Sequence, residues 1–225
     1  MHTKGILFLK NLCWIVLIAF LPSCIKYYKL SKTEFPQGKE RPLDRTVLFY
    51  DLKSKKVYKQ FATMAMFDVL YLSDKVRELY VDLYCKQHEG DKNAILRRQL
   101  EENKHWISFY ILSYIQDETH KSLADKDSIW SLVLRFAGDK QVSPISIEEV
   151  DLSPEIKSFF GYRFSRYKRS YLVKFPSKDS SGKFYLDDNS GFTLVSSAVD
   201  REVQFSWDKP PKLEKWKVYE DFYWF

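Results

Sequence analysis

Histidine and cysteine side chains are the first candidates for chemistry in this chain, which contains four of the former and three of the latter. His105 and His120, together with Asp117 or Glu118, would offer nitrogen and oxygen ligands to a zinc ion. The alternative is a set of surface or strand-end side chains, since no H-E-x-x-H or C-x-x-C spacing accompanies them. We therefore predict no metal site and no cofactor.

Cys85 and His88 are three residues apart, so on a helix they would share one face as a thiol and imidazole pair. A helix C-terminus disfavours a thiolate, and Cys85 lies in an apolar pattern, so we interpret it as a small buried hydrophobic residue. Acidic pairs at 148–149 and 187–188 are adjacent in sequence, and neighbours on a strand point to opposite faces. No G-x-S-x-G motif is present, and the sequence predicts no catalytic residue.

The segment YRFSRYKRSY, residues 162–171, alternates cationic and aromatic side chains. Guanidinium groups suit phosphate and carboxylate partners, and tyrosine rings suit sugar faces or lipid interfaces. One interpretation is a contact patch for an anionic envelope component or a partner protein, formed by Arg163, Arg166, Tyr167, Lys168 and Arg169. The other is a solvated connector whose aromatic rings close one end of a domain.

A second aromatic group lies in WKVYEDFYWF, residues 216–225. So much aromatic surface is rarely left in water, so we predict a tail that docks on a partner or on the domain itself. Its aromatic members are Trp216, Tyr219, Phe222, Tyr223, Trp224 and Phe225. Aromatic residues at period two are also typical of the closing strand of an outer-membrane barrel, an alternative that the predicted helices weigh against.

Ten apolar residues, LCWIVLIAFL at 12–21, follow Lys4 and Lys10. The run has the length of the apolar region of a secretory signal and is short for a membrane span, which needs about 20 residues. Leu-Pro-Ser-Cys follows and ends at Cys24. This boundary resembles the bacterial lipobox, in which Leu stands three places before an obligatory Cys and a small residue stands just before it.

The resemblance to a lipoprotein signal implies cleavage between Ser23 and Cys24 and attachment of lipid to the Cys24 thiol. Cleavage would also remove Cys13 and leave Cys85 without a partner for an intramolecular disulfide. The alternatives are an uncleaved anchor over 5–25 and ordinary secretion. In a bacterium, each of these places the rest of the chain outside the cytoplasm.

The remaining chain divides by composition into three parts. Residues 24–45 are charged and interrupted by prolines, which predicts a basic tether beside the membrane. A β-rich domain is expected over 46–208, with a helical insert at about 74–104. The aromatic tail occupies 209–225.

Hydrophobic periodicity and turn residues predict the elements of the domain. Helices are expected at 74–88 and 92–104, because a start signal at Ser73 precedes the first and Gly90 separates the two. A shorter helix is expected at 153–160. Strands are expected at 46–52, 57–72, 105–116, 128–136, 141–150, 170–175, 183–188, 192–199 and 202–207. The predicted fold class is α+β: a β-sandwich-like domain of about nine strands with an inserted helical hairpin.

Several segments of the body, including TVLFYDLKSKKVYKQF, YLSDKVRELYVDLY, DSIWSLVLRFAGDKQVSPISIEEV and RSYLVKF, are similar to a group of bacterial envelope lipoproteins. In that group a helical insert interrupts a β-rich domain, and the resemblance implies no particular activity. The net charge of +6 is too small to indicate nucleic acid, and the seven glycines form no phosphate-binding loop.

The sequence therefore predicts a lipid-anchored envelope protein that faces the periplasm or the cell exterior. Its expected role is a non-enzymatic binding or assembly module, with the membrane, an envelope protein or an anionic envelope polymer as partner. One alternative is an envelope hydrolase that acts on cell-wall or lipid substrates without a recognisable motif. Another is an outer-membrane-associated barrel or the partner of one.

Overall fold

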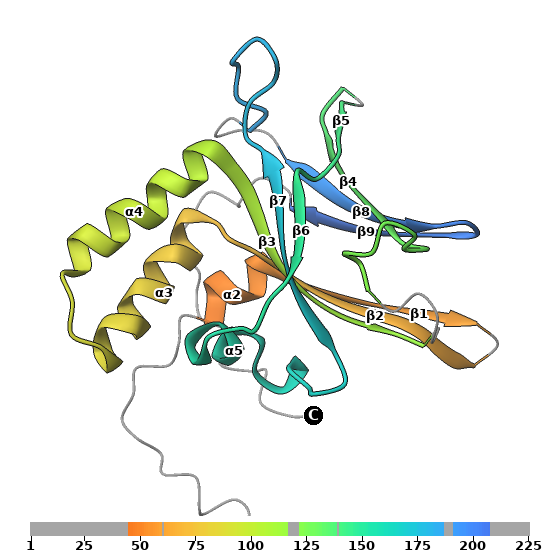
Figure 1. Ribbon diagram of the computed structural model, residues 1–225, viewed down its shortest axis with the longest axis horizontal. Coiled ribbons are helices and arrows are strands. Elements are labelled where there is room, and N and C mark those ends of the chain that lie inside the picture. Colours follow the sequence, from red (N-terminus) through yellow and green to blue (C-terminus); the bar gives the residue numbers. More distant parts are fainter. Residues whose placement is uncertain (1–44, 60, 117–121, 139, 187–190, 208–225) are drawn as a thin grey trace, which may run out of the picture. The chain divides into compact units, whose positions relative to one another are not determined.

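The computed structural model describes residues 45–59, 61–116, 122–138, 140–186 and 191–207. This part of the chain forms two antiparallel sheets and several helices (Figure 1), so the α+β class is confirmed. The helices are α2 (Arg45–Asp51), α3 (Asp74–Gln87), α4 (Lys92–His105), α5 (Pro154–Phe160) and the 3-10 turn η1 (Gly161–Arg163).

The strands divide between a five-stranded and a four-stranded sheet. The five-stranded sheet has the order β1 (Leu52–Lys59), β2 (Ala62–Tyr71), β3 (Trp106–Ile115), β7 (Arg169–Pro176) and β6 (Ser146–Glu149). The four-stranded sheet has the order β5 (Gln141–Val142), β4 (Ser131–Phe136), β8 (Phe192–Ala198) and β9 (Arg201–Trp207). The count of strands therefore agrees with the predicted number.

One buried apolar cluster draws side chains from both sheets. Phe109 of β3 lies with its ring centroid 6.0 Å from Phe192 of β8 and 5.4 Å from Trp207 of β9. Phe67 of β2 meets Trp130, before β4, edge to face at 5.0 Å. Each fully buried aromatic side chain contributes about 2–3 kcal/mol of hydrophobic free energy, so this cluster is the main source of stability.

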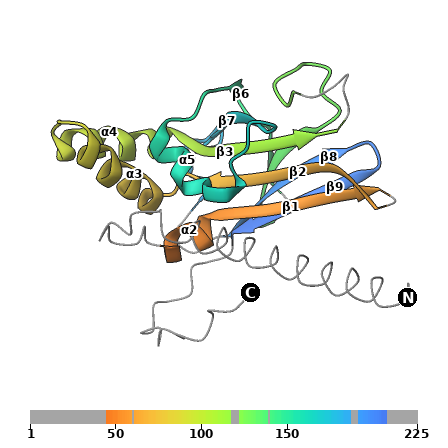
Figure 2. The same cartoon turned by 90° about the horizontal axis from the view of Figure 1, so that it is seen from below.

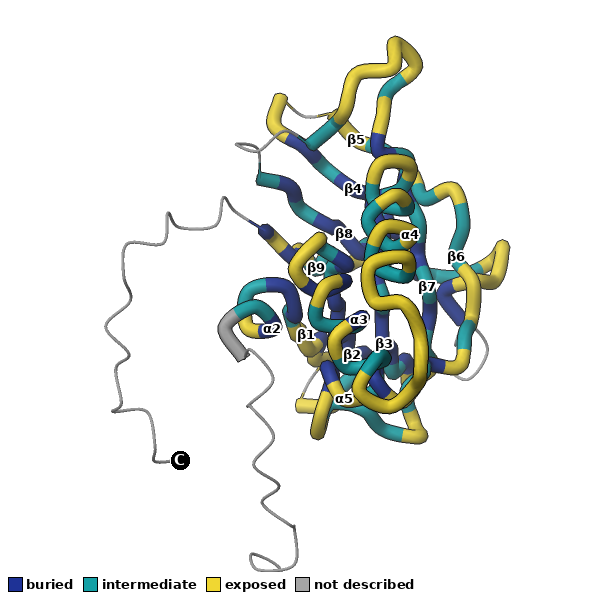
Figure 3. The backbone as a smooth tube through the Cα atoms, turned by 90° about the vertical axis from the view of Figure 1, so that its left-hand side faces the viewer, coloured by how far each residue is buried: buried dark blue, intermediate teal, exposed yellow. Residues whose placement is uncertain are grey.

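The predicted helical insert is present as α3 and α4, which lie beside one end of the five-stranded sheet (Figures 1 and 2). Ser73 begins α3, since its hydroxyl oxygen accepts a hydrogen bond from the Val76 amide, and Asp91 begins α4 in the same way. The buried residues of α3 are Val76, Arg77 and Val81. The outward side of α4 is exposed, whereas the strands behind it are buried (Figure 3).

The predicted strand at 46–52 is wrong, because this segment is helix α2. Leu48 and Asp51 are three residues apart in α2 and both buried, so the helix places them on the same inward face. Tertiary burial therefore overrides the β propensity of the local sequence. The KSKK segment, predicted as a turn, lies inside β1, and the single strand predicted at 57–72 is instead divided between β1 and β2. Exposed lysines suit β1, which is an edge strand of the five-stranded sheet.

The predicted strand at 141–150 is divided at Pro144 into β5 and β6, which belong to different sheets. Both pieces are edge strands, as expected of a segment that contains proline. The predicted strand at 183–188 is wrong over its described part, where one isolated bridge joins Lys178 and Phe184. There the carboxylate of Asp179 accepts hydrogen bonds from the amides of Ser181 and Lys183, which forms a local turn.

Asp51 joins three separate parts of this fold. Its side chain is buried and accepts a 2.7 Å hydrogen bond from the Ser73 hydroxyl at the start of α3. Its backbone carbonyl accepts a 3.2 Å hydrogen bond from the indole of Trp207 at the end of β9. Burial raises the pKa of Asp51 from 3.8 to about 6, although the Ser73 hydrogen bond and nearby Lys75 and Lys53 oppose the shift.

We predict that Asp51→Asn stabilises the protein at neutral pH. The native state holds a proton on Asp51 more tightly than the unfolded chain, so this group lowers stability as pH rises from about 4 to 6. Asparagine keeps an acceptor for Ser73 and carries no charge. The advantage of the variant in free energy of unfolding should grow from near zero at pH 4 to at most about 3 kcal/mol at pH 7.5. Urea titrations across this range measure it, and a pH-independent difference would contradict it.

Candidate functional site: a polar pocket beside the helix pair

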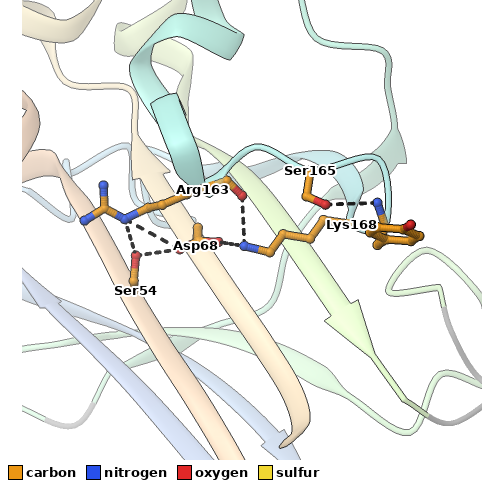
Figure 4. Close-up of polar contacts among 6 residues, drawn as sticks. Ser54, Asp68, Arg163, Ser165 and Lys168 are labelled. Atoms are coloured by element: carbon orange, nitrogen blue, oxygen red, sulfur yellow. Dashed lines mark hydrogen bonds and ion pairs between the residues drawn. The ribbon is translucent and has the colours of Figure 1, made fainter. Parts of the chain in front are cut away.

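The predicted cationic patch lies in the connector that leads from η1 into β7. Lys168 turns towards the sheet, where its Nζ lies 2.6 Å from Oδ2 of Asp68 on β2 and donates a 2.9 Å hydrogen bond to the Arg163 carbonyl (Figure 4). Arg163 Nε donates to the Ser54 hydroxyl at 2.9 Å and lies 3.8 Å from Asp68 Oδ1. Two of the five patch residues are therefore partners of one internal carboxylate.

Asp68 needs these partners because its side chain is only 6% exposed. An unpaired carboxylate at such a position would lose its hydration without compensation. Ser54 completes the set, since its hydroxyl donates a 2.5 Å hydrogen bond to Asp68 Oδ1. These ion pairs and hydrogen bonds thus join the connector to β1 and β2.

The other patch residues remain at the surface. Arg166 donates a 2.9 Å hydrogen bond to the Tyr167 hydroxyl and stacks over the same ring, whose residue is 69% exposed. Arg169 is paired with Glu149 of β6 at 3.2 Å. The outward positive charge is therefore smaller than the sequence indicates, and a ligand role for this surface stays a prediction.

The remaining candidates from the sequence are dispersed. His105 lies 3.9 Å from Glu101, and His88 lies 3.6 Å from Glu155 while its ring packs on Tyr84. Cys85 is a free, half-buried thiol on α3. Within the described ranges, no group of three His, Cys, Asp or Glu residues could hold a metal ion.

Several predicted residues lie outside the described part of the chain. They are Ser23, Cys24, Asp117, Glu118, His120, Asp187, Asp188, Trp216, Tyr219, Phe222, Tyr223, Trp224 and Phe225. The predictions made for them stand as predictions.

A pocket that the sequence did not predict lies between the helices and the five-stranded sheet, with a volume of about 290 Å³. This is at the lower end of the range for small-molecule sites. It opens over the face of the sheet turned away from the shared core, which we call the outer face. Helix α3, helix α4, strands β3 and β7 and the start of α5 supply its walls.

Arg77 of α3 is the charged group at the base of this pocket, and its side chain is only 3% exposed. Its Nε donates a 2.6 Å hydrogen bond to Asn103, and its Nη1 donates to Gln99 at 2.6 Å and to Glu102 at 2.7 Å. Its buried Nη2 has no hydrogen-bond partner within the described residues. A guanidinium has five N–H donors. The contacts with α4 use Nε and Nη1, so the two donors of Nη2 are left without a described partner.

A second buried group in the pocket also has spare hydrogen-bonding capacity. Ser108 of β3 is 1% exposed, lines the pocket, and its hydroxyl lacks a partner among the residues described. Lys174 of β7 adds a cation whose Nζ is 3.7 Å from Glu102. Buried polar groups are normally satisfied, so two unsatisfied groups in one pocket indicate a place for a ligand.

Two tyrosines complete the polar lining. Burial raises the pKa of Tyr80 and of Tyr110 above the ordinary value of 10.0, so both hydroxyls keep their protons at neutral pH. Both can therefore donate hydrogen bonds into the pocket. The lining offers a guanidinium, an ammonium group and hydroxyl donors, which together suit a small anion.

One feature of the sequence could have revealed this site. Arg77 recurs with Tyr80, Val81 and Tyr84 at spacings of three, four and seven, so it lies on the apolar face of α3. A charged residue on such a face requires partners from another element. The partners themselves come from α4, about 25 residues later, and only the packing of the two helices identifies them.

Comparisons with protein-family models, curated proteins and solved structures find no match to this chain. Within the described ranges, no helix is long and apolar enough to cross a bilayer. The function must therefore be argued from the site itself.

We predict that Lys168→Met lowers the free energy of unfolding by about 3 kcal/mol, because it leaves the buried Asp68 carboxylate without its nearest cation. Arg166→Met is the matched control, since Arg166 contacts Tyr167 at the surface, and its change should stay within about 0.5 kcal/mol. Urea denaturation measures both.

A double variant separates the charge from the packing of the lysine stem. Asp68→Asn combined with Lys168→Met should lose less stability than Lys168→Met alone, since no charge is then left unpaired. Equal losses in Lys168→Met and Arg166→Met would contradict the assignment.

Proposed function

We propose that this protein is a lipid-anchored binding module of the bacterial cell envelope, and that its pocket binds a small carboxylate ligand. The single observation that carries the ligand proposal is the buried guanidinium of the pocket-lining Arg77, whose Nη2 has no partner in the described chain. Nη2 retains two N–H donors, and charge-assisted hydrogen bonds from a guanidinium to a carboxylate are the strong ones.

The pocket's size and charge narrow the class of ligand. A volume of about 290 Å³ is room for roughly ten water-sized groups, which suits a compact molecule rather than a polymer. Glu102 balances one of the two cations, Arg77 and Lys174, and Asp151, the other carboxylate of the lining, is paired with Lys157. One positive charge is left, so the site matches a ligand with a single negative charge. Ser108 and the two tyrosines would orient the rest of the ligand by donating hydrogen bonds.

The anchoring part of the proposal is supported by the sequence. Lipid on Cys24 and the basic tether over 24–45 would hold the domain near a membrane outside the cytoplasm. We further infer that the two sheets form a sandwich around their shared apolar cluster. That rigid body would carry the pocket on its outer face.

We predict that the protein binds acetate or lactate at the pocket, measured by isothermal titration calorimetry at constant ionic strength. Arg77→Lys should weaken binding about tenfold, because a single ammonium group cannot both contact α4 and donate from the position of Nη2. Ser108→Ala should weaken it about fivefold by removing one donor. Arg97→Lys, on the exposed side of α4, is the matched control and should bind as the native protein does.

Three outcomes would contradict the carboxylate proposal. Carboxylate affinity that is the same in Arg77→Lys and Arg97→Lys would place binding elsewhere. Failure of both acetate and lactate to bind, or tighter binding of inorganic phosphate than of either, would overturn the carboxylate assignment. Thermal denaturation of each variant without ligand verifies that the fold is retained.

The lipid on Cys24 is tested separately by metabolic labelling with a fatty acid in a bacterial host. We predict that the native chain incorporates the label and that Cys24→Ala does not. Cys85→Ala is the matched control, because it removes the half-buried thiol of α3 and should label as the native chain does. Label retained after Cys24→Ala would overturn the lipid assignment.

A further inference from the structure

Two hairpin tips of the domain carry apolar residues where polar ones are usual. In the β1–β2 hairpin, Lys59 pairs with Ala62, so Phe61 belongs to the turn between them, and it is fully exposed. In the β8–β9 hairpin, Ala198 pairs with Arg201, so the turn consists of Val199 and Asp200, and Val199 is fully exposed. Turns of this length normally favour Asn, Asp and Gly.

The backbone at Phe61 makes the choice of residue more unusual. Its φ angle is 72°, in the left-handed region that large side chains rarely adopt. An exposed side chain gains no packing that would offset this strain. Residues that depart from the usual turn composition and backbone dihedral angles occur mainly at functional surfaces.

A hydrogen bond joins the two hairpins close to their tips. Nη1 of Arg201, at the start of β9, donates a 2.7 Å hydrogen bond to the carbonyl of Tyr58, near the end of β1. Figures 1 and 2 show both hairpins pointing in the same direction, away from α3 and α4. Phe61 and Val199 therefore belong to one surface, which we call the hairpin end.

Cations surround this surface. Lys55, Lys56 and Lys59 are exposed on β1, and with Arg201 they outnumber the acids Asp200 and Glu202 of the second hairpin. An open groove of about 630 Å³ runs between the edge strands β1 and β9, lined by Lys55, Lys56, Tyr58 and Arg201 among others. Tyr58 is 57% exposed, and such an aromatic ring with a polar end suits the boundary between water and lipid.

We propose that the hairpin end contacts an anionic phospholipid bilayer, with Phe61 and Val199 inserted at the boundary between headgroups and acyl chains. The lysines of β1 would then lie against the phosphates. Apolar tips with exposed lysines along the adjoining strand match the two requirements of interfacial binding, which are buried apolar area and attraction to anionic lipid. The inference depends neither on the pocket nor on the Cys24 lipid.

The test places a reporter at the tip of the full chain reconstituted into vesicles. Phe61→Trp adds an indole at the first hairpin. Phe184→Trp is the matched control, because Phe184 is a half-exposed aromatic beside Lys178 in the segment that follows β7. Pro176 at that end of β7 pairs with Trp106, whereas the Phe61 turn lies beyond the opposite end of β3.

Vesicles of phosphatidylcholine and phosphatidylglycerol in equal parts, with brominated acyl chains, quench only tryptophans that reach the bilayer. We expect the added emission of Phe61→Trp to be quenched roughly threefold more strongly than that of Phe184→Trp. Combining Phe61→Trp with Val199→Asp should abolish the excess quenching, as should vesicles of phosphatidylcholine alone.

Equal quenching of the two reporters would overturn the proposal. Excess quenching that persists unchanged in phosphatidylcholine alone would also overturn it, since the lysines would then have no part. A Phe61→Trp emission that shifts only when a second protein is added would assign the hairpin end to a protein partner instead.

Discussion

The central strand β3 is buried on both of its faces, and this constraint determines where the other features of the domain can lie. One face of β3, which includes Phe109, packs into the apolar cluster shared by the two sheets. The opposite, outer face carries Ser108 and Tyr110 and requires a separate cover. Helices α3, α4 and α5 and the connector before β7 supply that cover. These segments between the strands are therefore needed to bury the outer face of β3.

Two polar sites on the outer face solve the problem of buried charge in different ways. Asp68 is matched by Lys168, Arg163 and Ser54, so its carboxylate is fully compensated and fastens the connector. Among the described residues, Arg77 has partners for Nε and Nη1 only, and Ser108, whose hydroxyl has none, lines the same pocket. A compensated charge stabilises a fold, whereas a partly compensated one beside a cavity has capacity left for a ligand. This contrast separates the pocket from the Asp68 network as a binding site.

Much of the secondary structure could be predicted from the sequence because its signals are local. Ser73 and Asp91 begin α3 and α4 at the expected places, and β3, β7, β8 and β9 follow their apolar periodicity. Helix α2 could not be predicted, since Leu48 and Asp51 are buried together only when the helix packs against the rest of the fold.

The sites were harder to predict than the elements because they depend on contacts distant in sequence. Lys168 resembled a solvated charge, and its partner Asp68 lies 100 residues earlier. Arg77 gains its partners from a different helix, and its pocket also needs Ser108 and Lys174 from two further strands. Residue types alone indicated cations near aromatic rings, and only the packing distinguishes those that are paired inside from those that remain available.

The proposed pocket and the hairpin end lie towards opposite ends of the same strands. Ser108 pairs with Lys174 near the helix end of the five-stranded sheet, whereas Ala65 pairs with Ile115 near the hairpin end. Contact of the hairpin tips with a bilayer would therefore leave the pocket directed away from the lipid and accessible to a soluble ligand. A tether alone would permit every orientation of the domain, but a tether combined with apolar tips would select this one. In this orientation the hairpin end with its strained Phe61 turn would contact the membrane, and the pocket with the half-satisfied Arg77 would face the solution.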